Sequence, residues 1–460
     1  MANKAFIDKR LVHKYNLPVP RYTSYPTVPY WQDNIKAYDW KENFREQFML
    51  NNKNKGISLY MHLPFCESLC TYCGCNKKIT TNHKVENEYI PAIQKEWDFY
   101  RHLMEDKPVI RELHIGGGTP TFFSPENLNR LLNYILDDVI IHPQHEFSIE
   151  GHPNNTTKAH LQMLFDLGFR RISYGVQDNN EYVQKIINRI QPFENIVEAT
   201  YMARKAGFTS VNFDLIYGLP FQTVDSIEQT FNEVLQLRPD RIAFYSYAHV
   251  PWTSKAQRLF DEHDLPGPTQ KIELYLTGKK LLLDNGYYDI GMDHFALPHD
   301  ALYKASADGT LHRNFMGYTT QHTGMLAGLG VSAISDSGTG YAQNEKTIAG
   351  YYQRVHNGEI PVRKGYFLNK EDIIFKQYIL DICCRGETYF LEESLPLLEE
   401  YSFPALQEFA EDGLIVFNKT AAKLTPEGHY FIRNIASAFD IKLRRQNIAA
   451  LNNQVFSKSI

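Results

Sequence analysis

Between residues 57 and 247 the chain alternates short apolar runs with segments whose apolar residues recur at helical spacing. Short runs rich in β-branched and aromatic residues predict strands. In sequence order these are Ile57–Pro64, Glu112–Gly116, Glu146–Glu150, Arg171–Val176, Ser210–Tyr217 and Arg241–Tyr247. The segments between them predict helices, and Ser124, Pro125 and Glu126 are a typical helix start. Regular alternation predicts parallel strands with the helices outside.

Six strand–helix units are fewer than the eight of a closed barrel. We therefore expect an α/β fold, a partial (β/α)6 TIM-like barrel that is open on one side. In such folds the chemistry lies at the C-terminal ends of the strands. Here those ends read HLPFC, GGGTP, EGHP, GVQ, YGLP and YAHVP. Glycine and proline there are also ordinary turn residues, but a cysteine on the first end favours a functional site.

The pattern changes on either side of this region. Residues 1–55 are rich in proline, and we expect an irregular N-terminal segment that covers the barrel opening. Residues 56–345 form the expected catalytic domain, with a further helix at Gln270–Asn285. Residues 346–460 are expected to form a mostly helical C-terminal domain.

Charge and composition narrow the function. A net charge of −5 gives no basic excess for nucleic-acid binding. No run reaches the roughly 18 apolar residues that would span a membrane. The start MANKAFIDKR lacks the features of a signal peptide, so a cytoplasmic protein is expected. Four of the six cysteines lie between residues 66 and 75, which in a reducing compartment favours metal ligands over disulfides.

Cys66, Cys70 and Cys73 have the spacing C-x3-C-x2-C. Three thiolates on one loop suit a [4Fe–4S] cluster with one iron free of protein ligands. The alternative is a zinc ion with Cys75 as fourth ligand. It is disfavoured because Cys75 follows Cys73 by only two residues.

This cysteine motif, with Tyr72 before its last cysteine, is similar to the signature of the radical S-adenosylmethionine (SAM) superfamily. Further motifs resemble the oxygen-independent coproporphyrinogen III oxidases of that superfamily. In order they are PRYTSYPT (Pro20–Thr27), YMHLPFC (Tyr60–Cys66), CGCN (Cys73–Asn76), LHIGGGTPT (Leu113–Thr121), GVQD (Gly175–Asp178), FDLIYGLP (Phe213–Pro220), YAHVP (Tyr247–Pro251), GMDHFA (Gly291–Ala296), LHRNFMGYTTQ (Leu311–Gln321), GLGVSAIS (Gly328–Ser335) and RNIASAFD (Arg433–Asp440).

The resemblance implies a barrel of the radical SAM type and an activity in haem biosynthesis. Two propionates of coproporphyrinogen III would be decarboxylated to vinyl groups by 5′-deoxyadenosyl radicals, giving protoporphyrinogen IX. It implies one cluster per chain, on Cys66, Cys70 and Cys73, and two SAM molecules. The first SAM would be held by Tyr60, Gly117, Glu150 and Ile334. The second would be held by Tyr72, Gly118, Thr119, Gln177, Arg189, Asp214 and Ala248.

Several of these residues also have a structural interpretation. Asp214 lies in an apolar strand and needs a partner, for which Arg189 is a candidate, so the two could form a structural ion pair. Glu150 could be an ordinary solvated residue. The sequence after Glu150, Gly151–His152–Pro153, departs from the apolar residue and Asp usual in the family.

Three residues are candidates for catalysis and substrate binding. Cys75 matches a family cysteine that is not a cluster ligand. Arg21 and Arg313 lie in aromatic, otherwise uncharged segments, and we expect them to face the substrate propionates. Arginines in such surroundings can also be surface residues that bury only their stems.

Two relatives compete with the oxidase. One is a haem chaperone, which usually has Asp-Phe where this chain has Gly74-Cys75, and the other is a radical SAM haem methyltransferase. A reductase or a flavodoxin- or ferredoxin-type protein is the expected electron donor, and a monomer is the expected state. Cys383–Cys384 is expected to be a pair of buried thiols.

Overall fold

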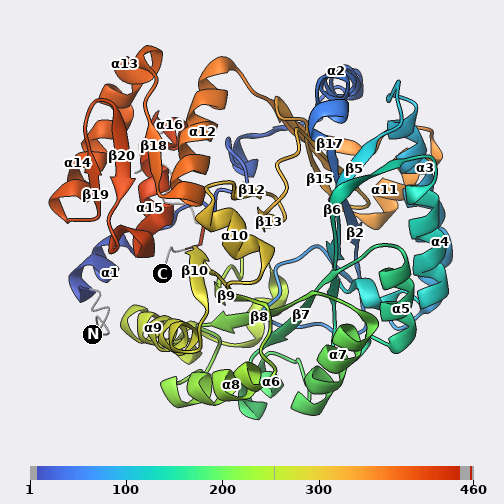
Figure 1. Ribbon diagram of the computed structural model, residues 1–460, viewed down its shortest axis with the longest axis horizontal. Coiled ribbons are helices and arrows are strands. Elements are labelled where there is room, and N and C mark those ends of the chain that lie inside the picture. Colours follow the sequence, from blue (N-terminus) through green and yellow to red (C-terminus); the bar gives the residue numbers. More distant parts are fainter. Residues whose placement is uncertain (1–7, 253, 446–455, 458–460) are drawn as a thin grey trace.

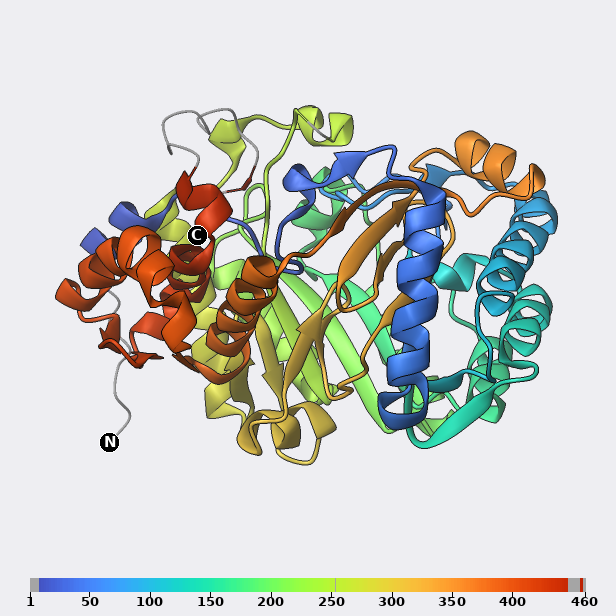
Figure 2. The same cartoon turned by 90° about the horizontal axis from the view of Figure 1, so that it is seen from above.

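The computed structural model describes residues 8–252, 254–445 and 456–457. A 13-stranded sheet curves through the molecule with helices outside it (Figures 1 and 2). Its central strands are all parallel. They are, in spatial order, β14 (Leu326–Leu329), β2 (Ile57–Leu63), β5 (Val109–Gly117), β6 (Ile140–Gly151), β7 (Arg171–Gln177), β8 (Ser210–Tyr217) and β9 (Arg241–Ser246). The six predicted strands are present and adjacent in sequence order, which confirms the parallel barrel.

Side chains alternate between the two faces of these strands. On β8, Val211 and Phe213 are fully buried in the hydrophobic core between sheet and helices. Asn212 and Asp214 face the barrel interior, where they bond to Ser173 of the neighbouring strand. The outer face therefore holds the fold together, and the inner face is free to carry polar groups.

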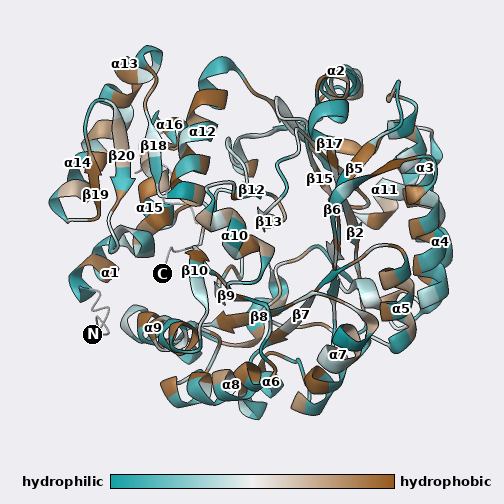
Figure 3. Cartoon of the chain, viewed as in Figure 1, coloured by the Kyte–Doolittle hydropathy of each residue, from teal (hydrophilic) through white to brown (hydrophobic). Residues whose placement is uncertain are grey.

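Helices cover the outer face of the sheet (Figure 1). They are α3 (Glu86–Arg101), α4 (Pro125–Leu136), α5 (Lys158–Asp166), α6 (Glu181–Ile186), α7 (Phe193–Ala206), α8 (Val224–Gln236) and α9 (Pro268–Asp284). Helix α4 begins as predicted, since Ser124 Oγ accepts a hydrogen bond from Asn127 N at its N-terminus. Hydrophilic residues predominate on α4 in Figure 3, whereas β8 is mostly hydrophobic.

The sheet extends beyond the six predicted strands. Next to β14 lie the antiparallel strands β15 (Ile334–Asp336), β16 (Gly340–Asn344), β17 (Val362–Phe367) and β1 (Gln32–Asp33). Next to β9 lie β11 (His294–Ala296) and β10 (Tyr288–Gly291). In the described part of the chain the edge strands β1 and β10 do not pair, so the barrel is open. The sheet runs across both predicted domain boundaries, which stay predictions.

The expectation of an irregular N-terminal segment is wrong. It contains α1 (Lys9–Tyr15) and the 19-residue helix α2 (Ala37–Lys55). Trp40, Phe44 and Phe48 recur every fourth residue on α2 and are fully buried. They form one apolar stripe that packs α2 against the barrel. The prolines lie between the two helices rather than within them.

The C-terminal part combines helices with a small sheet. Its elements are α11 (Ile348–His356), α12 (Lys370–Arg385), α13 (Leu395–Leu397), α14 (Phe403–Glu411), α15 (Ile432–Ala436), α16 (Ile441–Arg445), β18 (Glu387–Tyr389), β19 (Ile415–Phe417) and β20 (Ala421–Leu424). All of it from α12 onward lies on the side of the molecule where α1 lies, whereas α11 lies beside α3 (Figure 1). The ring of Tyr15 on α1 lies 5.0 Å from that of Phe409. The two ends of the chain therefore pack together. Within the described ranges, no helix is both long and apolar enough to cross a membrane.

Candidate active site

A cavity of about 700 Å³ opens at the C-terminal ends of the central strands. Its wall combines the loop that follows β2 with the ends of β5, β6, β7 and β8. Most of the residues predicted for the site line it: Cys66, Cys70, Tyr72, Cys73, Cys75, Gly117, Gly118, Thr119, Glu150, Gln177, Arg189 and Asp214. The sequence motifs thus meet in one place although they are spread over about 150 residues.

The cysteine loop begins at β3 (Phe65–Cys66), which pairs with β4 (Lys78–Ile79). Donors surround its sulfur atoms: Thr119 Oγ1 lies 3.3 Å from Cys66 Sγ, and Arg189 Nη1 lies 3.6 Å from Cys70 Sγ. Thr71 N donates to Ile187 O just after α6 and anchors the loop. Hydrogen-bond donors and a cation next to thiol groups favour their thiolate form, which is the form that binds metal.

The thiols differ in acidity. A hydrogen bond from Cys75 lowers the pKa of Cys73 to about 6, whereas burial raises the pKa of Cys66 to about 11. In the described residues no group of three or more His, Cys, Asp and Glu side chains gathers as around one metal ion. A zinc site would require such convergence, whereas a four-iron cluster takes each thiolate on a different iron.

The three glycines at the end of β5 allow a close approach of backbone strands. A Cβ atom on Gly118 would lie 2.6 Å from Pro64 O, and one on Gly117 would lie 2.8 Å from Leu63 O. Gly117 also has φ +125°, a conformation that favours glycine. The cavity wall is therefore backbone here, and a ligand can contact it directly.

Glu150 closes the cavity from the end of β6. Its Oε2 accepts a hydrogen bond from Gly117 N at 3.2 Å, and its Oε1 lies 3.5 Å from His114 Nε2. The Glu150 side chain keeps 43% of its surface exposed. It can therefore accept further hydrogen bonds from a ligand in the cavity.

Arg189, the candidate partner of Asp214, makes its contacts elsewhere, and the alternative of a structural ion pair between the two is not seen in the described residues. Asp214 accepts hydrogen bonds from Ser173 Oγ at 3.0 Å and Asn212 Nδ2 at 2.9 Å. Burial, reinforced by the charge of Glu150, raises its pKa to about 6. Arg189 instead donates to Gly175 O at 2.5 Å, and its buried Nε has no hydrogen-bond partner. Both groups thus keep bonding capacity that protein contacts leave unused.

Three of the residues predicted to hold SAM do not line the cavity. Tyr60 lies on β2, where its ring stacks on His114 with the centroids 6.0 Å apart. Ile334 lies across β14 from Tyr60: Gly328 pairs with Tyr60, and a Cβ on Gly328 would lie 2.4 Å from Ile334 O. Ala248 is connected through Gln257, whose Nε2 donates to both Ala248 O and Tyr72 O.

The departure at Gly151–His152 lies on the cavity wall. His152 N donates to Thr121 Oγ1, and His152 Nδ1 accepts from Asn154 N. Burial, together with the nearby Arg189, lowers the pKa of His152 to about 3. A neutral imidazole therefore lies on the cavity wall at this position.

Arg21 and Arg313 lie together, away from the cysteine loop. Arg313, on β12 (His312–Asn314), donates from Nη2 to Arg21 O at 3.3 Å. Arg21 donates from Nη2 to Ser246 O at the end of β9. Arg313 is only 8% exposed, its guanidinium group lies over the ring of Tyr318, and its Nε and Nη1 have no hydrogen-bond partner among the described residues. The interpretation of Arg313 as a surface residue is therefore wrong.

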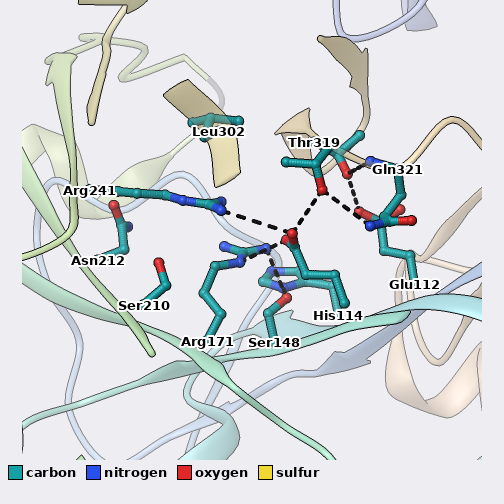
Figure 4. Close-up of polar contacts among 12 residues, drawn as sticks. Glu112, His114, Ser148, Arg171, Ser210, Asn212, Arg241, Leu302, Thr319 and Gln321 are labelled. Carbon is teal, nitrogen blue, oxygen red and sulfur yellow. Dashed lines mark hydrogen bonds and ion pairs between the residues drawn. The ribbon is translucent and has the colours of Figure 1, made fainter. Parts of the chain in front are cut away.

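The opposite end of the barrel interior holds a different polar group, which we call the barrel floor. It consists of Glu112, Arg171 and Arg241, which Figure 4 labels, and of Glu146, which contacts both arginines. Arg171 Nε donates to Glu146 Oε1 at 3.0 Å, and Arg241 Nη2 lies 3.9 Å from Glu146 Oε2. Glu112 accepts hydrogen bonds from Ser58 and from Thr319 of β13 (Gly317–Thr319). Glu146 is thus matched by two arginines, whereas Glu112 is bonded to hydroxyl groups and burial raises its pKa to about 7.

The sequence analysis missed His114, Ser148, Ser173 and Asn212, which support the cavity residues from inside the barrel. The sequence contains a pattern that could have identified these residues. Each is a polar residue in an otherwise apolar strand, and Ser148 and Asn212 stand two positions before Glu150 and Asp214. Polar residues at period two mark the inner face of a strand.

The open parallel barrel with a three-cysteine loop at its C-terminal end defines a radical SAM protein. A family model described as the Radical SAM superfamily matches residues 60–234. The residues suit the cofactors of that superfamily, because three thiols share one loop, the half-exposed Glu150 lines the cavity, and the buried Nε of Arg189 has no hydrogen-bond partner. The predicted radical SAM barrel is therefore confirmed, and a [4Fe–4S] cluster and SAM are its cofactors.

The chain is 38% identical over 465 residues to the oxygen-independent coproporphyrinogen III oxidase of Pseudomonas aeruginosa, covering 98% of each protein. It is 39% identical to that of Escherichia coli, covering 95% of this chain and 96% of the relative. The solved structure of coproporphyrinogen III oxidase (HemN) from E. coli, a radical SAM enzyme, superposes with a TM-score of 0.87 at 36% identity, covering 96% of this chain and 100% of that one. The chain belongs to the oxygen-independent coproporphyrinogen III oxidase family, as its motifs predicted.

Proposed function

We propose that this chain catalyses the anaerobic oxidative decarboxylation of two propionate side chains of coproporphyrinogen III to vinyl groups in haem biosynthesis. The product is protoporphyrinogen IX. The observation that carries this proposal is the three-cysteine loop on a cavity whose polar groups are incompletely paired, together with two neighbouring arginines, the half-buried Arg21 and the buried Arg313. A carboxylate substrate needs such cations because the chain as a whole is acidic.

Cys66, Cys70 and Cys73 hold the cluster, one per chain, and the cavity takes two SAM molecules. When bound, these groups supply the one-electron chemistry that removes a hydrogen atom from a propionate β-carbon. Tyr60, Gly117, Glu150 and Ile334 hold the first SAM. Tyr72, Gly118, Thr119, Gln177, Arg189, Asp214 and Ala248 hold the second. The unpaired Nε of Arg189 and the raised pKa of Asp214 support a ligand beside them.

Arg21 and Arg313 bind substrate propionates. Their support is the burial of Arg313 and the two unpaired nitrogens of its guanidinium group, which can meet a carboxylate through two hydrogen bonds. Cys75 acts in turnover rather than in cluster binding. It lines the cavity and contacts Cys73, which fits a group close to the reacting atoms.

A flavodoxin- or ferredoxin-type protein, or a reductase, donates the electron, and the enzyme works as a cytoplasmic monomer. Lys77 Nζ donates to Cys73 O, and the exposed Lys78 follows on β4. Positive charge next to the cluster loop suits an acidic donor protein, because complementary charges steer association.

The test is anaerobic incubation of the reconstituted protein with coproporphyrinogen III, SAM and a one-electron reductant. We expect two propionates to be converted to vinyl groups, and chromatography measures the product. Tight haem binding without turnover would indicate a haem chaperone instead. Methyl transfer from SAM to haem would indicate a haem methyltransferase.

Equilibrium dialysis with labelled SAM tests the cofactor count separately. We expect two SAM per cluster-loaded chain, and one after Asp214→Ala. A value of one in the intact protein would contradict the second site while leaving the reaction itself open to the turnover test.

A further inference from the structure

Three polar side chains form a row across the inner face of the barrel. His114 on β5 pairs in register with Ser148 on β6, and Ser148 pairs with Arg171 on β7. The side chains are bonded in the same order (Figure 4): Ser148 Oγ lies 2.8 Å from His114 Nδ1, and Arg171 Nη2 donates to Ser148 Oγ at 2.9 Å. Because Arg171 also donates to Glu146 at 3.0 Å, the row is anchored at the barrel floor.

This row decides which nitrogen of His114 carries the ring proton. Ser148 Oγ accepts the hydrogen bond from Arg171, because a guanidinium group can only donate. Within the described residues, Ser148 Oγ bonds only to Arg171 and His114, so its own hydroxyl proton is directed to His114 Nδ1. A neutral imidazole whose Nδ1 accepts carries its proton on Nε2. That nitrogen lies 3.5 Å from Glu150 Oε1.

Glu150 leans from β6 onto the same face of β5. Its carboxylate lies over Gly116, where a Cβ atom would be 2.9 Å from Glu150 Oε1 and 3.1 Å from Oε2. Gly117 N donates to Oε2, and the buried ring of His114 faces Oε1. Each carboxylate oxygen thus has one protein group beside it. The rest of the half-exposed carboxylate is open to the cavity that it lines.

We propose that His114 is a positioning residue for SAM binding. The Nε2 proton of its neutral ring holds Glu150 in the orientation that accepts hydrogen bonds from the cofactor. This inference rests on the proposed function, in which Glu150 holds the first SAM. A neutral donor suits the task because it leaves the carboxylate its charge, and hydrogen bonds to a charged acceptor are the stronger ones.

The competing explanation is that His114 only fastens β5 to β6 through Ser148. Two substitutions separate the explanations, because each keeps one side of the ring. The amide of Asn reaches the position of Nδ1, and the amide of the longer Gln reaches the position of Nε2. If only the bond to Ser148 matters, His114→Asn is the milder change. If the contact with Glu150 matters, His114→Gln is the milder one.

The experiment is an anaerobic calorimetric titration of the cluster-loaded protein with SAM. Glu150→Gln should weaken one SAM site and thereby identify it. We expect His114→Asn to weaken the same site by about tenfold, and His114→Gln by less than about threefold. Ser148→Ala frees the ring and should weaken this site by about threefold. His145→Asn, the same change at a half-buried histidine of β6 outside the cavity wall, is the control and should leave SAM affinity unchanged.

A second background completes the test. In Glu150→Gln protein, His114→Asn should have no further effect on SAM affinity, since a positioning residue acts only through the group that it positions. An equal loss in both backgrounds, or a loss with His114→Gln as large as with His114→Asn, would overturn the proposal. If His114→Asn does not retain the cluster, Ser148→Ala is compared in the same two backgrounds.

The same titrations separate this inference from the proposed function. If Glu150→Gln binds SAM as the wild type does, the proposed role of Glu150 fails, and this inference fails with it. If Glu150→Gln weakens SAM binding and neither His114→Asn nor Ser148→Ala does, only this inference fails.

Discussion

The two ends of the barrel interior carry similar residues in opposite states. At the floor, Glu146 is bonded to Arg171 and Thr320 and lies near Arg241. At the cavity, Asp214 is bonded only to neutral Ser173 and Asn212, and Arg189 keeps an unpaired Nε. Burial affects both acids, but the arginines lower the pKa of Glu146 to about 2, whereas that of Asp214 rises to about 6.

Both ends are built on the same strands. Glu146 and Glu150 are four residues apart on β6, and Ser210 and Asp214 are four apart on β8. Position along a strand therefore separates the two groups: Glu146 at the floor is paired with arginines, whereas Asp214 at the C-terminal end lines the cavity, where we propose that it contacts a ligand. Buried polar groups are normally satisfied, so an unsatisfied group points to function.

The largest expected effect is at the cysteine loop. Changing Cys66, Cys70 or Cys73 to Ser should each abolish the brown absorbance of the reconstituted cluster, because each removes a thiolate ligand. Cys75→Ser should keep the absorbance and impair turnover. Cys384→Ser, a half-buried thiol far from the loop in sequence, is the control and should change neither. Loss of the cluster in Cys75→Ser alone would refute the ligand assignment.

Substitutions at the barrel floor should change the free energy of unfolding. Arg241→Met leaves Asp300 and Glu146 buried without that partner, which should lower the free energy of unfolding by about 3–5 kcal/mol. Arg313→Met removes a buried cation that has two unpaired nitrogens, so its melting temperature should stay the same or rise. Melting temperatures at one fixed scan rate compare the variants. Equal destabilisation by both would remove the distinction between the two regions.

Substrate binding should respond at Arg21 and Arg313. Replacing either with Leu should raise the KM for coproporphyrinogen III roughly tenfold to a hundredfold, since a charged hydrogen-bond pair is lost. Cluster content and SAM affinity should be unchanged. The exposed Arg130 on α4 provides a control, Arg130→Leu. Wild-type kinetics in both active-site variants would leave the N-terminal segment with a structural role only.

The smallest expected effect is a dependence of SAM affinity on pH. Asp214 and Asp178 are both buried acids whose pKa is raised from 3.8 to about 6. For either acid, the favourable contribution to folding is complete below pH 3.8 and is lost as the pH rises through about 6. Only Asp214 lines the cavity, whereas Asp178 is bonded to Gln222.

SAM affinity should therefore be about tenfold weaker at pH 5 than at pH 7, because the ionised Asp214 accepts the hydrogen bonds of the ligand. Asp214→Asn should remove this dependence, and Asp178→Asn should keep it. Calorimetric titration at several pH values measures it. An unaltered pH profile in Asp214→Asn would assign the dependence to another group.

Much of the barrel could be predicted because its signals are local. The six strands and the Ser124 cap follow from short windows of sequence. Strand β14 escaped prediction because Gly328 and Gly330 make it look like a turn, and it becomes a strand only by pairing with β2. Helix α2 could have been found from the spacing of Trp40, Phe44 and Phe48, but the nearby prolines obscured it.

The sequence motifs predicted which residues belong to the site, but not which of these residues bond to one another. The motifs named the cavity residues, but the partner of Asp214 depends on the register of β7 against β8, which sets Ser173 opposite Asn212. Arg433 bonds to Val19 O only when the two ends of the chain pack together. No local pattern encodes that contact.

The most direct test of the account follows the carboxyl carbons themselves. Coproporphyrinogen III labelled with ¹³C in the propionate carboxyl groups is incubated anaerobically with the reconstituted protein, SAM and a reductant. The account predicts two labelled CO₂ molecules per porphyrinogen and a product with two vinyl groups. Unlabelled gas and an intact tetracarboxylate, from protein that carries a full cluster and binds SAM, would contradict it.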